Sequence, residues 1–141
     1  MPGLCKIGVM VLGARDIDQL CEFAINFLLG GQGSAKELAA VLVMDRPDRS
    51  PLEVIFVLSS AAASIEEVLA GEEARALALD AWRIAALLAV DLHMMQVLQR
   101  PNLHCHALLA YWQTEDPFFL GRPATPRTAP RQATPRLVAP A

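Results

Sequence analysis

The segment from Glu72 to Gln99 constrains the fold more than any other part of this sequence. It reads EEARALALDAWRIAALLAVDLHMMQVLQ and is rich in residues that favour helix. Acidic side chains open the segment, which suits the dipole of a helix, and Arg100-Pro101 ends it. At about 1.5 Å per residue, such a helix would be roughly 40 Å long. The sequence therefore predicts one long helix, 72–99, as the centre of the fold.

Apolar residues of this segment fall on more than one side of the predicted helix. One side carries Leu77, Ala81, Ile84, Leu88 and Met95, and other sides carry Leu79, Ala86 and Val90. A helix that is apolar on most sides is normally surrounded by other helices. The pattern therefore favours a helical bundle.

Three capping boxes predict where other helices begin. In such a box, the capping side chain stands three residues before a Glu or Gln. The boxes start at Ser34, at Ser50 and, with Asp in place of Ser or Thr, at Asp16. The box at Ser50 is the strongest, because Pro51 follows at the first helical position. We expect the helix that begins at Asp16 to end at Gly30-Gly31, and the helix that begins at Ser34 to end near Asp45. The helix that begins at Ser50 should end at Gly71. A last helix should cover about Asn102–Gln113.

Two short apolar runs could instead form strands. Residues 54–60 are apolar and partly β-branched, but the capping box directly before them favours helix. Residues 5–13 are left open between strand and helix. Followed by RDIDQLCEF, they would suit the strand–turn–helix start of a nucleotide-binding fold, but the chain has neither GxGxxG nor GxxxxGK[ST] to hold phosphate.

Length and composition indicate one domain with more apolar surface than a small core can hide. The chain has 141 residues, of which 54% are hydrophobic and 19% are charged. The longest uncharged stretch in its middle, residues 54–65, is too short to span a membrane. We predict an all-α domain, residues 1–120, with about five helices. Its surplus apolar surface would contact a protein partner or a second copy.

The C-terminal segment, residues 121–141, differs from the rest in composition. It holds four arginines, no acidic residue and five prolines, and it has too little apolar surface to fold alone. We predict a disordered tail. Its Arg127, Arg131 and Arg136 are candidate contacts for a partner or an anionic surface, and the tail could equally fold back on residues 1–120, which hold eight basic and 15 acidic side chains.

Nucleic acid is not expected as a partner of the helical part. The run GSAKELAAVL would suit the first helix of a helix-turn-helix unit. The next helix, PLEVIFVLSS, is apolar and offers no side chain that could read a base edge.

Cysteine usage favours a reducing, cytoplasmic setting. Cys5, Cys21 and Cys105 are odd in number and widely spaced, with no CxxC, which argues against a disulfide framework. Ten arginines against two lysines, with frequent alanine, are typical of a GC-rich bacterial genome.

The run His104-Cys105-His106, with His93 on the preceding helix, gives the weak candidates for a metal or thiol site. Residues at i and i+2 of a helix point about 200° apart, so these two histidines could not grip one metal ion from a helix. No i, i+4 pair of ligands accompanies them. We therefore expect no metal, no cofactor and no catalytic residue.

The aromatic residues near the end of the predicted domain are candidates for partner binding. Tyr111, Trp112, Phe118 and Phe119 lie within nine residues, beside a proline break. Alternatively, Trp112 and Phe118 close the end of the bundle. The sequence thus predicts a small helical interaction protein of adaptor, accessory or chaperone-like type. A helical metal or thiol enzyme and a regulator that binds nucleic acid through its arginine tail are the alternatives.

Overall fold

The computed structural model describes residues 4–99 and 104–121, with side chains from Asp16 onward, and confirms the all-α prediction. The described residues form five α-helices and a short 3-10 helix, with no strand among them. These elements are α1 Leu4–Leu29, α2 Ala35–Asp45, α3 Pro51–Val68, α4 Glu72–Val97, α5 Cys105–Thr114 and η1 Pro117–Leu120. Beyond Gly121, the predicted tail with its arginines lies outside the described residues.

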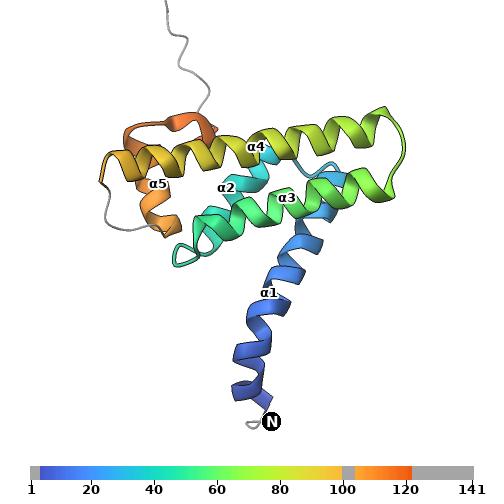
Figure 1. Ribbon diagram of the computed structural model, residues 1–141, viewed down its shortest axis with the longest axis horizontal. Coiled ribbons are helices and arrows are strands. Elements are labelled where there is room, and N and C mark those ends of the chain that lie inside the picture. Colours follow the sequence, from blue (N-terminus) through green and yellow to red (C-terminus); the bar gives the residue numbers. More distant parts are fainter. Residues whose placement is uncertain (1–3, 100–103, 122–141) are drawn as a thin grey trace, which may run out of the picture.

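The long helices α3 and α4 run antiparallel, side by side (Figure 1). The shorter α2 packs against both of them, and α5 packs against α2 and α4. The C-terminal half of α1 crosses α3, and the N-terminal half of α1 points away from the bundle (Figure 1). None of the helices among the described residues combines the length and the apolar character that crossing a membrane requires.

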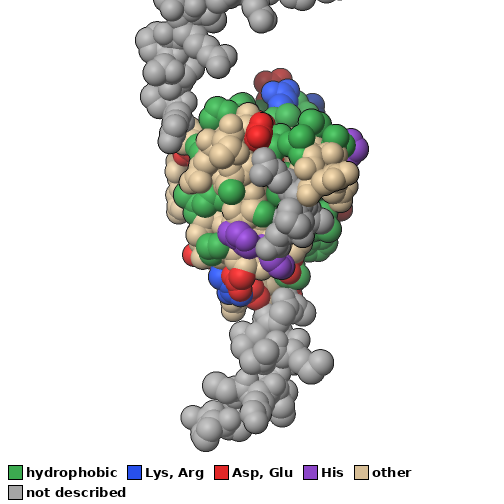
Figure 2. Space-filling view, turned by 90° about the vertical axis from the view of Figure 1, so that its left-hand side faces the viewer, with side chains coloured by type: hydrophobic (Ala, Val, Ile, Leu, Met, Phe, Trp, Pro, Cys, Tyr) green, Lys and Arg blue, Asp and Glu red, His purple; other side chains and the backbone are tan. Residues whose placement is uncertain are grey.

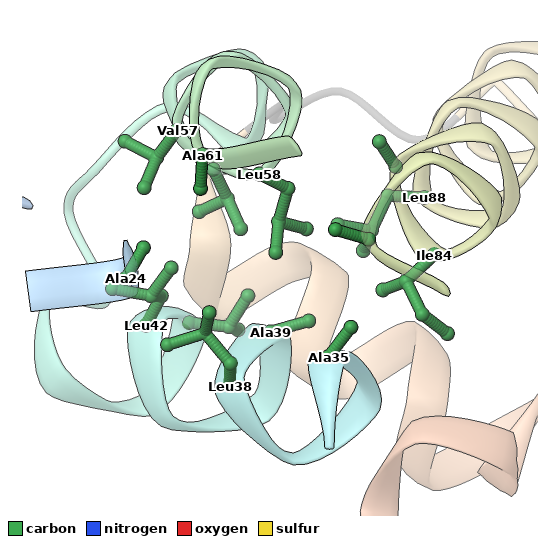
Figure 3. Close-up of a cluster of buried hydrophobic side chains, with 14 of the residues drawn as sticks. Ala24, Ala35, Leu38, Ala39, Leu42, Val57, Leu58, Ala61, Ile84 and Leu88 are labelled. Carbon is green, nitrogen blue, oxygen red and sulfur yellow. The ribbon is translucent and has the colours of Figure 1, made fainter. Parts of the chain in front are cut away.

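The core lies where α1, α2, α3 and α4 meet (Figure 3). Leu38, Leu58 and Leu88 are fully buried there, each from a different helix. Burial of a leucine side chain contributes about 1.5–3 kcal/mol to folding. Between the leucines lie buried alanines, such as Ala39 and Ala61, whose small side chains allow the helix backbones to approach closely (Figure 3).

Two of the three predicted capping boxes begin helices as expected. The Ser34 hydroxyl accepts a hydrogen bond from the Glu37 N–H at 3.3 Å and caps α2. The Ser50 hydroxyl caps α3, but it accepts from the Leu52 N–H at 3.3 Å, one residue earlier than a capping box requires. The carboxylate of Glu53 lies 3.6 Å from the guanidinium of Arg49.

The prediction that a helix begins at Asp16 is wrong, because Asp16 lies inside α1. Residues 5–13, left open by the sequence, are helical. An aspartate can cap a helix only where the chain before it leaves the helical conformation, and residues 3–15 contain no proline that would force that break. The Asp16 carboxylate instead lies 3.9 Å from the guanidinium of Arg46.

Glycines mark the turn between α1 and α2 and the turn between α3 and α4. Gly31, with a φ of 67°, follows α1 in the left-handed conformation that glycine adopts without strain. Gly71, predicted to close α3, instead caps the start of α4 with a φ of 114°, and α3 ends earlier, at Val68.

Helix α4 is long as predicted, although it ends at Val97 rather than Gln99. One side, with Ala81, Ile84, Leu88 and Met95, is buried against the bundle. Leu79 and Val90, on the opposite side, are exposed. The apolar residues of α4 therefore form part of the core on one side of the helix and an exposed apolar surface on the other.

Candidate functional site

The His104-Cys105-His106 run forms the start of α5 rather than part of its body. His104 is the N-terminal cap in an extended conformation, Cys105 is fully buried, and both histidines are exposed. The two imidazole rings stack with their centroids 6.0 Å apart. The expectation that they point to opposite sides is wrong, because it assumed a helical backbone at His104.

The candidate metal ligands do not come together in one group. Figure 2 looks onto the end of the bundle that carries α5, and its exposed histidine side chains do not gather at a single place. His93 lies beside Gln96 on α4, next to the start of α3. Among the described residues, no group of three or more His, Cys, Asp or Glu side chains is placed to hold a metal ion.

Cys105 is a poor candidate for a nucleophile in this structure. The pKa of the Cys105 thiol is raised to about 11, mainly by burial; Arg49 opposes this rise, and the carboxylates of Glu53 and Asp48 add to it. The reactive form of cysteine is the thiolate. At neutral pH this side chain is therefore an uncharged thiol that fills the core.

The first amides of α5 are capped by main-chain carbonyl groups from the loop between α2 and α3. The Cys105 N–H donates to the Arg49 carbonyl at 2.8 Å, and the His106 N–H donates to the Pro47 carbonyl at 2.8 Å. A helix start needs acceptors for its free N–H groups, and His104 provides no side-chain cap. The His-Cys-His run therefore joins α5 to this loop.

Arg49 supports this loop from inside the protein and was not identified from the sequence. Its guanidinium is buried, donates to the Leu42 carbonyl at 3.3 Å and lies 3.6 Å from the Glu53 carboxylate. The sequence offers one signal for it, since Arg49 and Glu53 stand four residues apart.

Most of the predicted aromatic contacts lie in the core. Tyr111, Trp112 and Phe119 are buried, and the rings of Trp112 and Phe119 stack with centroids 4.6 Å apart. Phe118 is 44% exposed, and the Lys36 ammonium lies 4.3 Å from the centre of its ring. In this structure Phe118 is the member of the group with an open surface.

A buried carboxylate holds Trp112 in place. The indole N–H of Trp112 donates to Asp91 on α4 at 2.9 Å. The pKa of Asp91 is raised to about 7, mainly by burial; the bond from Trp112 opposes this rise, and the nearby Asp116 carboxyl adds to it. The arrangement lets Asp91 change its charge near neutral pH while it lies inside the protein.

Helices α3 and α4 both carry large apolar side chains that are exposed. We call this surface, made of Leu52, Phe56, Trp82, Val90 and Val97, the α3–α4 face. Beside Leu52 a hollow of about 300 Å³ opens between the two helices. Its lining residues are Ser50, Pro51, Leu52, Ile55, Ala89, Leu92, His93 and Gln96. At the other end of the face, the Trp82 indole N–H donates to the Glu66 carboxylate at 3.1 Å.

Comparisons with known proteins add no relationship to this geometry. Neither a protein-family model, nor a curated protein, nor a solved structure matches the chain. The function must therefore be argued from the surfaces of the molecule itself.

Proposed function

We propose that the chain is a protein–protein interaction module that binds a helical segment of a partner protein on the α3–α4 face. The observation that carries this proposal is the exposure of large apolar side chains, with Leu52 66% and Phe56 54% exposed. Apolar patches exposed on a protein surface mark interaction sites. The hollow beside Leu52 offers a place for one anchoring side chain of the partner.

Charge supports a partner segment that combines apolar and basic residues. Residues 16–121 hold 15 acidic and six basic side chains, and Glu66 and Glu67 are exposed at one end of the α3–α4 face. A basic helix with an apolar stripe would be attracted to this surface and would cover its apolar centre. The same negative charge opposes binding of nucleic acid by the helical part.

The proposal is tested by introducing charge into the face. The double variant Leu52→Glu with Val90→Glu leaves the core intact, because both side chains are exposed. We expect the wild-type chain to recover a partner from cells of its source. The affinity of the double variant for this purified partner should be at least tenfold lower than that of the wild type. Calorimetry with the purified partner measures the change.

A matched variant separates loss of this face from a general effect of added charge. Val41→Glu with Met44→Glu places the same two charges on the exposed side of α2, and binding should remain unchanged. Equal binding by the double variant and the wild type would show that the partner uses another surface.

A further inference from the structure

Helix α1 is divided into two halves with different surroundings. In the half nearer its C-terminus, Ala24, Phe27 and Leu28 are buried in the bundle, and Cys21 contacts Ser60 of α3. The other half continues as helix into the space beside the bundle, where no other described element accompanies it (Figure 1). At 26 residues, the whole helix is about 39 Å long.

The projecting half of α1 has a mostly apolar sequence, which is unfavourable in contact with water. Residues 4–15 read LCKIGVMVLGAR, with eight apolar residues, two glycines and two basic residues. A helix that is apolar on nearly all sides is normally buried, and a single helix of about 12 residues is only marginally stable by itself in water. Something must therefore cover this half of α1.

The charges of α1 are sorted along its length. Lys6 and Arg15 are the charged residues of the projecting half, while Asp16, Asp18 and Glu22 follow directly. Asp18 and Glu22 are exposed, whereas Asp16 lies near Arg46 of its own chain. If two such helices packed in parallel, like charges would lie next to each other. If they packed antiparallel, the basic half of each helix would lie near the acidic part of the other.

We propose that the projecting half of α1 packs antiparallel against α1 of a second copy of the chain, which gives a dimer with two-fold symmetry. In an antiparallel pair, residues 12–14 of the two copies lie side by side, and Lys6 of one copy is then level with the segment from Asp18 to Glu22 of the other. Within one helix, that segment lies about 18–24 Å from Lys6. The same patch is used on both copies, as a closed two-fold dimer requires. This interface is separate from the α3–α4 face and does not depend on the function proposed above.

The first test is the mass of the full chain in solution, measured by analytical ultracentrifugation from 1 to about 100 µM, concentrations that we choose to bracket ordinary dimer affinities. We expect a dimer for the wild type and a monomer for Leu12→Glu, which changes only the projecting half. Val90→Glu should remain dimeric, and circular dichroism should show that all three chains are folded. A wild-type chain that is monomeric at the highest concentration would overturn the proposal. Binding of the monomeric chain to phosphatidylcholine–phosphatidylglycerol vesicles, measured by flotation, would also overturn it.

The second test concerns direction. Lys6→Glu and Asp18→Lys should each weaken the dimer about three- to tenfold, and the two changes together should restore much of the affinity. With Cys5 and Cys21 changed to serine, mild oxidation should cross-link a chain carrying both Lys6→Cys and Glu22→Cys into dimers. Glu22→Cys alone should not cross-link, because its two copies lie far apart in an antiparallel pair. Efficient cross-linking of Glu22→Cys alone would show a parallel pair and refute the proposed arrangement.

Discussion

Asp91 is the buried carboxylate whose protonation is coupled to the stability of the fold. Its folded-state pKa is about 7, above the ordinary value of 3.8, because burial disfavours the charged form. A carboxyl with a raised folded pKa adds stability that is full below the ordinary pKa and is lost as the pH rises through the folded one. The protein should therefore lose stability between about pH 4 and pH 7.

We expect the melting temperature of the wild type to fall from pH 5 to pH 8, and that of Asp91→Asn to change much less. The amide oxygen of asparagine still accepts from Trp112, so the variant removes the titration and keeps the bond. Asp48→Asn, at an exposed carboxylate, serves as the control and should keep the wild-type slope. Parallel pH profiles for the wild type and Asp91→Asn would contradict this explanation.

Arg49 contributes to stability through its buried hydrogen bond and its ion pair with Glu53. We expect Arg49→Ala to lower the free energy of unfolding by about 2–4 kcal/mol, since the Leu42 carbonyl loses its donor and a space opens below the loop. Urea denaturation measures the loss. Glu53→Gln, which keeps the packing of Arg49, should cost less than half as much, and an equal loss for the two variants would assign the effect to the ion pair alone.

At the scale of single elements, Ser34 tests how much of α2 depends on its cap. Ser34→Ala removes the acceptor for the Glu37 N–H, and we expect a loss of about 1 kcal/mol. Ser34→Asp keeps an acceptor at the same position and should remain within a few tenths of a kcal/mol of the wild type. Thermal unfolding of both variants checks the comparison, and an unchanged melting temperature for Ser34→Ala would mean that the cap adds nothing.

The helix starts that the sequence predicted correctly are those with local causes. Ser34 and Ser50 act on amides two or three residues away, so the pattern and the structure agree there. Asp16 matched the same pattern, yet no local signal ended the helix before it, and α1 continues through it. A capping pattern is therefore informative only when the chain before it also breaks.

The features of the candidate site that the sequence missed depend on distant contacts. Asp91 and Trp112 stand 21 residues apart and meet because α5 packs against α4. The role of the His-Cys-His run as the start of α5 depends on carbonyl groups more than 50 residues earlier in the chain. No periodicity within one segment carries such information.

At the scale of the whole molecule, most of the apolar residues lie in three parts. One part forms the core, a second forms the α3–α4 face, and a third is the projecting half of α1, while single exposed side chains such as Val41 and Phe118 lie elsewhere. The composition predicted a surplus of apolar surface, but it could not say where that surplus lies, because α4 has apolar residues on all sides and tertiary packing alone decides which side is covered.

The carbonyl groups of Pro47 and Arg49 that cap α5 have a consequence for amide hydrogen exchange. The Cys105 and His106 N–H groups are held by a loop rather than by their own helix, so they exchange with solvent when α5 and that loop separate. Their exchange rates should therefore follow the local opening of residues 46–49, and α5 should become ordered during folding only after α2 and α3 have brought this loop into position.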